Sequence, residues 1–146
     1  MTSIEPADLR LAKELILEYA NATGVDLSFQ GFAEEIDHLD THYEVLFVAK
    51  LDGEPAGCVA LRRIDDETSE MKRLYIRPAF RGKDLGRALA THAIEEARRR
   101  GYRRMLLDTL PSMRTAMALY ESLGFVDVPA YRYNPIEGTR YVELAW

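Results

Sequence analysis

The stretch that most constrains the fold is residues 81–88, which join a strand to a helix. They follow Leu74-Tyr75-Ile76, an apolar run that predicts a strand, and Pro78, which cannot lie inside a hydrogen-bonded ladder. The longest helical pattern in the chain then runs from Gly86 to about Arg100. A glycine loop between strand and helix leaves backbone N–H groups unpaired at the positive end of the helix, and this arrangement binds phosphates.

Three cationic side chains strengthen the preference of this loop for anions. Arg81, Lys83 and Arg87 lie within seven residues of one another. Each can add a charge-assisted hydrogen bond worth about 1.5–3 kcal/mol. The loop matches neither of the common nucleotide fingerprints, G-x-G-x-x-G and G-x-x-x-x-G-K-[ST]. Taken alone, it therefore leaves two interpretations open, a phosphate site and a glycine turn before an ordinary basic helix.

Periodicity along the rest of the chain predicts a single α/β domain over residues 1–146. Asp8 is expected to cap the first helix, and Gly24 lies just beyond the end of that helix. The order of elements is typical of a mixed sheet with helices on its faces. The expected helices cover about 9–22, 32–39, 86–100 and 111–123, and the expected strands cover 45–51, 56–64, 69–76, 103–108, 125–133 and 139–146.

Composition narrows the function classes. A net charge of −5 argues against general nucleic-acid binding, which requires a basic face. No apolar run approaches the ~18 residues of a membrane span, and no signal-peptide pattern begins the chain. With Cys58 as the one cysteine, no disulfide can form within a chain, which suits a reducing cytoplasm. His38 and His42 could be two metal ligands, but the sequence offers no further cluster of ligands to complete a site, so we expect no bound metal.

Three blocks in a fixed order resemble the GCN5-related N-acetyltransferase (GNAT) superfamily. They are Glu70-Met71-Lys72-Arg73-Leu74-Tyr75-Ile76, residues 81–88, and Ala116-Met117-Ala118-Leu119-Tyr120-Glu121-Ser122-Leu123-Gly124-Phe125. The resemblance covers residues 45–126 in motif detail and the whole chain in element order. It implies a mostly antiparallel central sheet flanked by helices on both faces. It also implies acetyl transfer from acetyl-CoA to a primary amine of a small molecule or amino acid.

The resemblance also implies roles for individual residues. Tyr120 matches the tyrosine that commonly protonates the departing thiolate, and Glu70 matches the general base of some members. Main-chain groups of the strand would bind the pantetheine arm, and loop amides would bind the pyrophosphate. The residues implied to bind the coenzyme are Leu74, Ile76, Arg81, Gly82, Lys83, Leu85, Gly86 and Arg87.

Two positions depart from the family pattern. Asp84 stands where the loop motif has its middle glycine, and its carboxylate would repel a pyrophosphate unless it points to solvent. Met113 stands where many members have an asparagine. The neighbouring Ser112 either takes the place of that asparagine or caps the following helix, and capping is the expectation.

The chemistry of amine acetylation gives both catalytic candidates a function, and each also has a structural alternative. An alkylammonium must lose a proton before it attacks a thioester, and a carboxylate can accept that proton. Strand alternation would place four side chains on one face: Glu70, Lys72, Leu74 and Ile76. Alternatively, Glu70 is a strand-edge charge paired with Lys72 or Arg62, and Tyr120 is a core aromatic.

Residues 26–44 are the expected acceptor end, together with the loop between the last two strands. The first segment carries six acids and no Lys or Arg. Carboxylates and aromatic rings attract ammonium groups, so we expect a small amine with a second cationic or aromatic group. The alternative is an acidic helix face that only contacts water. The candidate substrate-binding residues are Phe29, Phe32, Glu34, Tyr131 and Tyr133.

A non-catalytic coenzyme-A-binding module that regulates a partner is the second function class. The pairing of Glu70 with Tyr120 favours the enzyme, while Asp84 and the missing asparagine leave room for the module. The sequence is compatible with a homodimer but does not fix the oligomeric state.

Overall fold

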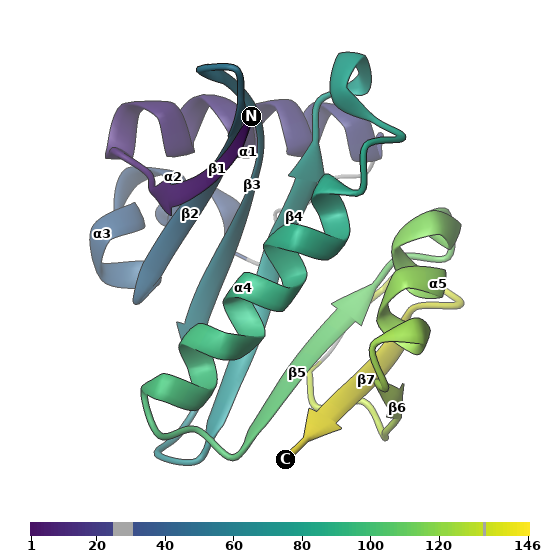
Figure 1. Ribbon diagram of the computed structural model, residues 1–146. Helices are drawn as coiled ribbons and strands as arrows, with labels where there is room; N and C mark the ends of the chain where they lie inside the picture. The colour runs from purple at the N-terminus through teal and green to yellow at the C-terminus, as the bar shows by residue number, and fades with distance from the viewer. Residues whose placement is uncertain (25–30, 133) are drawn as a thin grey trace.

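A seven-stranded mixed sheet, in the order β1-β2-β3-β4-β5-β7-β6, forms the centre of the computed structural model, which describes residues 1–24, 31–132 and 134–146 (Figure 1). Every neighbouring pair is antiparallel except β4 and β5. The strands are β1 (Thr2–Pro6), β2 (Val45–Leu51), β3 (Glu54–Arg63), β4 (Thr68–Ile76), β5 (Arg104–Thr109), β6 (Val126–Asp127) and β7 (Arg140–Ala145).

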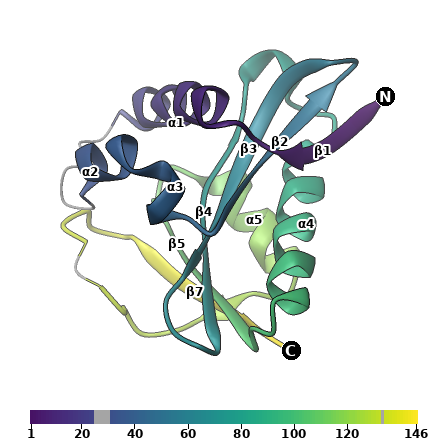
Figure 2. The ribbon, with the colours of Figure 1, turned by 90° about the vertical axis from the view of Figure 1, so that its left-hand side faces the viewer.

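Helices cover both faces of the sheet (Figure 2). One face carries α1 (Leu9–Thr23), α2 (Phe32–Asp37) and α3 (Leu39–His42), and the other carries α4 (Leu85–Arg99) and α5 (Arg114–Ser122). The main core lies between the sheet and α4, where Leu89, Ala90 and Ala93 are fully buried. The expected mixed, mostly antiparallel sheet flanked by helices on both faces is confirmed.

The cap signals at the first helix are confirmed at atomic detail. The Asp8 carboxylate accepts a hydrogen bond from the Leu11 N–H at 2.8 Å. Gly24 ends the helix in the left-handed conformation, with φ of 65°. Both contacts satisfy backbone groups that a helix end leaves unpaired.

The main differences from the sequence prediction concern β1, β6 and the start of α5. Strand β1 was not expected, because this edge strand is exposed apart from the half-buried Ile4 and has no apolar alternation. The strand expected over 125–133 is only Val126–Asp127, since Pro129 has no N–H for a ladder. Helix α5 begins at Arg114 with Met113 as its N-cap residue, so the expectation that Ser112 caps it is wrong.

One extra residue in β4 reverses which side chains face which layer. Cys58 of β3 pairs with Tyr75, but Ala60 pairs with Lys72, and Arg73 between them has φ of 60°. This is a β-bulge, which interrupts the two-residue alternation of a strand. The expectation that Glu70 and Lys72 share a face with Leu74 and Ile76 is therefore wrong. Leu74 and Ile76 pack into the α4 core, whereas Lys72 lies opposite Ala60, which packs against α1 and α3.

A buried ion pair holds the bulged residue. The Arg73 guanidinium donates to both carboxylate oxygens of Glu35 on α2, at 2.9 and 2.6 Å. The rings of Tyr19 and Phe32 lie 5.4 and 5.5 Å from the same guanidinium carbon. Burial alone would raise the pKa of Glu35, but Arg73 outweighs burial and lowers it. The pair thus joins α2 to β4 through two side chains that are buried from solvent.

Removing the charge of Glu35 should destabilise the fold strongly. Glu35→Gln leaves the Arg73 charge buried without its counterion, which typically costs about 3–5 kcal/mol. Urea denaturation measures this loss as a fall in the free energy of unfolding. The neighbouring exposed Glu34→Gln is the matched control and should change that free energy by less than about 0.5 kcal/mol. Equal stabilities of the two variants would contradict the role given to the pair.

Candidate active site

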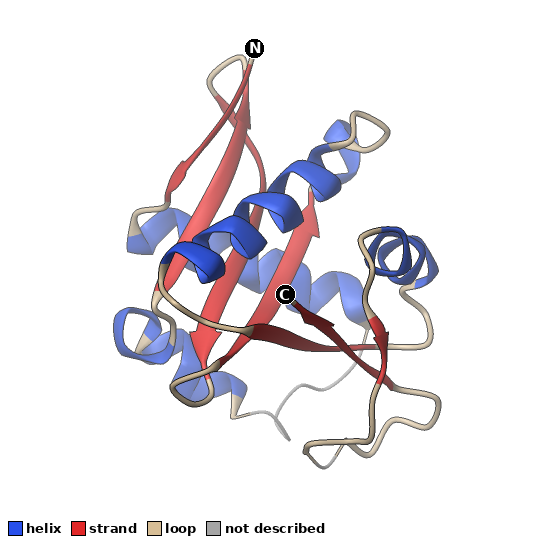
Figure 3. Ribbon diagram, turned by 60° about the horizontal axis from the view of Figure 1, so that its bottom comes forward, coloured by secondary structure: helices blue, strands red, loops and turns tan. Residues whose placement is uncertain are grey.

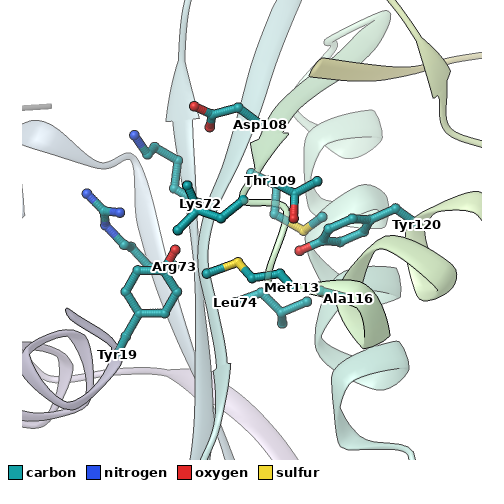
Figure 4. A pocket seen from close by; sticks show the side chains of 11 residues that line it. Tyr19, Lys72, Arg73, Leu74, Asp108, Thr109, Met113, Ala116 and Tyr120 are labelled. Atoms are coloured by element: carbon teal, nitrogen blue, oxygen red, sulfur yellow. The ribbon is translucent and has the colours of Figure 1, made fainter. Parts of the chain in front are cut away.

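The two parallel strands separate and open a cavity between them. Pairing of β4 with β5 ends at Glu70 and Leu106, well before either strand ends. Beyond that point the cavity separates the strands, and Tyr19 of α1 and part of α5 close it (Figure 4). The strand residues that line the cavity are Met71, Lys72, Arg73 and Leu74 of β4 and Asp108 and Thr109 of β5.

A groove continues from this cavity along β4 to the start of α4. A hollow of about 420 Å³ shares Tyr19, Leu74 and Met113 with the cavity and extends to Gly86. A second hollow of about 390 Å³ shares Gly86 and Arg81 with the first and reaches Arg87. The shared walls make one continuous path from the N-terminus of α4 to the gap between the strands.

The loop at the outer end of the groove leaves helix N–H groups open. Gly82 and Asp84 have φ of 80° and 63°, in the left-handed region that Gly and Asp tolerate best. Asp84 is the N-cap residue of α4, yet its side chain accepts no hydrogen bond from the first turn. Its carboxylate is 79% exposed and lies 3.6 Å from the Arg87 guanidinium. The side chain therefore points to solvent, and the first-turn N–H groups face the groove.

Most of the residues predicted to bind the coenzyme lie along this path. Arg81 folds back so that its Nε donates to the Ile76 carbonyl at 3.2 Å, and Arg87 donates to the Ser122 hydroxyl at 2.9 Å. Lys83 is the exception among them, because it lines neither hollow. Those that line the groove are Leu74, Ile76, Arg81, Gly82, Leu85, Gly86 and Arg87.

Tyr120 lies where the groove meets the cavity. Its ring packs against Phe125 in the main core, and its hydroxyl points into the cavity from α5 (Figure 4). Only 7% of the residue is exposed, and this burial raises the pKa of the phenol well above its ordinary value. The structure thus places Tyr120 in the core as an aromatic and its hydroxyl at the cavity, a position compatible with either interpretation.

Glu70 is fully buried and does not line the cavity. One carboxylate oxygen accepts from the Tyr131 hydroxyl at 2.7 Å and from Arg132, and the other lies 3.5 Å from Arg62. Burial alone would raise the pKa of Glu70, but Lys72 and Arg132 lower it. The carboxylate is thus engaged by the loop before β7, and the sequence prediction of a contact with Arg62 agrees with this geometry.

The sequence analysis missed three charged side chains of the cavity wall: Lys72, Arg73 and Asp108. Burial, followed by the charge of Arg73, lowers the pKa of Lys72 to about 8. Among the residues that the structure describes, the buried Oδ2 of Asp108 has no hydrogen-bond partner. The available signal was an aspartate directly after the apolar run Met105–Leu107, near the point where the strand passes into a loop, and loops often carry binding residues.

The predicted substrate residues are only partly brought together. The ring of Phe32 packs on the Arg73 guanidinium. The ring of Tyr131 meets that of Tyr141 edge to face, with the ring centroids 5.4 Å apart, and its hydroxyl donates to Glu70. Glu34 is exposed and lines none of the hollows above. Phe29 and Tyr133 lie outside the described residues.

Neither a metal-ligand group nor a membrane-spanning helix occurs in the part of the chain that the structure describes. Over residues 1–24, 31–132 and 134–146, His, Cys, Asp and Glu form no group of three that could hold a metal ion. Within the same ranges, no helix has the length and apolar character needed to cross a membrane.

Comparison with known proteins places this architecture in a family. A Schizosaccharomyces pombe protein named as an uncharacterized N-acetyltransferase is 37% identical over 95% of this chain and 89% of its own length. The Mus musculus N-acetylaspartate synthetase is 33% identical over 94% of this chain, which spans 47% of that protein. The Salmonella typhimurium protein yncA, a putative acetyltransferase solved with its cofactor acetyl-CoA, superimposes with a TM-score of 0.71 at 24% identity, covering 99% of this chain and 93% of that one. The model of the acetyltransferase (GNAT) family matches residues 11–125, and the chain belongs to this family.

Proposed function

We propose that this protein transfers an acetyl group from acetyl-CoA to a primary amine of a small molecule or amino acid. The observation that carries the proposal is the continuous groove, which joins open helix N–H groups to the buried Tyr120 hydroxyl. The acetyl-CoA in the yncA structure supports the cosubstrate, and the name of the mouse relative supports an amino acid among the acceptors. We place this reaction in the cytoplasm, in keeping with the buried free thiol of Cys58.

The residues of the groove fit the parts of acetyl-CoA, which would supply a thioester-bound acetyl group. The first-turn N–H groups of α4, with Arg81 and Arg87, offer donors and positive charge for phosphates. The apolar side chains of Leu74 and Ile76 line the part of the groove next to the cavity, which suits a pantetheine arm. Gly86 lines this passage too, and it leaves room for one methyl group, because an added Cβ would meet Leu119 at an ordinary contact distance of 3.6 Å.

Coenzyme binding should therefore depend on the size and charge of residue 86. Gly86→Ala adds one methyl at ordinary contact distance from Leu119, so the affinity for coenzyme A should change little. Gly86→Glu adds a carboxylate that blocks the groove and repels phosphate, so calorimetry should detect no binding. Both variants should keep the wild-type circular dichroism spectrum. Wild-type affinity in Gly86→Glu would place the coenzyme elsewhere.

Tyr120 is proposed to donate its proton to the departing sulfur. As the new N–C bond forms and the C–S bond breaks, negative charge develops on sulfur, and the buried Tyr120 phenol, which lines the cavity, can donate a proton to it. The raised pKa keeps that proton in place until the thiolate forms.

Tyr120→Phe tests this role because it removes the hydroxyl and keeps the ring. General acid catalysis is typically worth about 10²–10⁴ in rate, so kcat should fall by that order. The KM for acetyl-CoA should stay the same, because the hydroxyl acts as the bond breaks. Wild-type kcat in the variant would leave Tyr120 with a packing role alone.

The proton of the amine requires an acceptor, and the geometry favours Asp108 over Glu70. Both oxygens of Glu70 face cationic or hydroxyl donors, and Glu70 does not line the cavity. Asp108 lines it and has an unpartnered buried oxygen, as judged over the described residues. We therefore propose that Asp108 accepts the proton and that Glu70 positions Tyr131 and Arg132.

Isosteric substitutions distinguish the proposed roles of Asp108 and Glu70. Asp108→Asn should lower kcat by about 10²-fold or more with an unchanged KM for acetyl-CoA. The deficit should shrink with acceptor amines of lower pKa, which need less help to lose a proton. Glu70→Gln should mainly reduce stability, because Arg132 loses its counterion. An equal deficit in Asp108→Asn for amines of every pKa would argue against a base.

The second candidate is the non-catalytic coenzyme-A-binding module. It would retain the groove without using Tyr120 or Asp108. A thiol-release assay with acetyl-CoA and a panel of amines distinguishes the two, since only the enzyme releases coenzyme A in proportion to the amine added.

A further inference from the structure

One part of the cavity carries both signs of charge. Lys72 comes from β4 and Asp108 from β5, so the two side chains approach the gap from opposite walls. Figure 4 shows the Lys72 amine and the Asp108 carboxylate in the same part of the view, while the Tyr120 hydroxyl enters from α5, apart from them. A small molecule in this gap would therefore meet a cation and an anion within one site.

Among the residues that the structure describes, the charged groups in and around the cavity include one more cation than carboxylates. Arg73 is paired with Glu35, and the single carboxylate of Glu70 is shared by Arg62 and Arg132. Lys72 and Asp108 balance each other in sign. Together these groups amount to four cations and three carboxylates. A ligand that brings only an ammonium group adds to the excess, whereas a ligand that also brings a carboxylate does not.

Lys72 is placed as a binding group rather than a surface charge. It is 6% exposed, and burial is the main cause that lowers its pKa, followed by the charge of Arg73. A carboxylate delivered to the cavity would offset both effects, because it adds an opposite charge in a site of low dielectric constant. Charge-assisted hydrogen bonds in such sites are among the strongest that proteins form.

We propose that the acceptor is an amino acid, whose ammonium group binds Asp108 and whose carboxylate binds Lys72. This deepens the proposed function and rests on it. Lys72 then determines specificity, and Asp108 holds the amine next to the thioester end of the groove. The assignment takes the place of the expected recruitment, by the acidic segment, of a small amine with a second cationic or aromatic group. Three of the described acids of that segment, Glu34, Asp37 and Asp40, are exposed on α2 and α3.

Matched acceptors test the carboxylate requirement in the wild-type protein. Each amino acid is compared with its own amide, which keeps the amine and side chain but lacks the negative charge. Calorimetry on the protein saturated with coenzyme A gives the affinity, and initial rates with acetyl-CoA give kcat/KM. A charge-assisted bond predicts that the amino acid is favoured by about 10- to 100-fold in both measurements.

Substitution of Lys72 tests which residue provides that preference. Lys72→Met keeps the approximate length of the side chain and removes its charge, so the ratio between the amino acid and its amide should fall to about one, whatever happens to the affinity for the amide itself. Amine basicity cancels, because the same two acceptors are used with both proteins. The matched control is Lys13→Met on the exposed surface of α1, which should keep the full preference. Lys72→Gln serves as a second neutral variant if the circular dichroism of Lys72→Met is not native.

The outcomes separate this inference from the function on which it rests. Wild-type turnover of amino acids and amides without a preference would overturn the acceptor class, and an undiminished preference in the Lys72 variants would overturn the role of Lys72. Failure of the wild type to release coenzyme A with any amine would instead overturn the proposed acetyltransferase reaction.

Discussion

The extra residue at Arg73 and its buried pair with Glu35 hold together the centre of the molecule. A left-handed conformation at a non-glycine residue costs roughly 1–2 kcal/mol, so a surrounding contact must enforce it. The bidentate contact with Glu35, between the rings of Tyr19 and Phe32, provides that enforcement. Helices pack against both sides of the sheet (Figure 3), and Glu35 lies on one of them, α2. Moving α2 away from β4 would leave both charges without their partner.

The bulge also divides the site into two chemical regions. Before it, Lys72 points toward the layer of α1 to α3; after it, Leu74 and Ile76 belong to the α4 side. A regular strand would place all three on one face and mix charged with apolar walls. The bulge instead gives an apolar passage from the glycine loop and a polar end beside β5. The early end of the β4–β5 ladder supplies the space in which the two regions meet.

Charge is distributed by tertiary pairing rather than by sequence blocks. The acidic stretch over 26–44 suggested a surface that attracts cations, yet its buried member, Glu35, neutralises Arg73. Glu70 is likewise neutralised by Arg62 and by Arg132 from the loop before β7. Over residues 31–132, these two buried carboxylates are therefore held by arginines of the same fold.

The sequence by itself determined the features that depend on neighbouring residues. These include the Asp8 cap, the glycine loop at the start of α4 and the place of Tyr120 on the helix that follows β5. Local hydrogen bonds and periodicity determine such features, so a short stretch of the sequence is enough to predict them. Only the tertiary structure decided the bulge, because Arg73 has no local signature and its partner lies 38 residues away. The tertiary structure alone also decided that Lys72 and Asp108 line the same cavity. The reason is that β4 and β5 are separated along the chain and must first pair and then diverge.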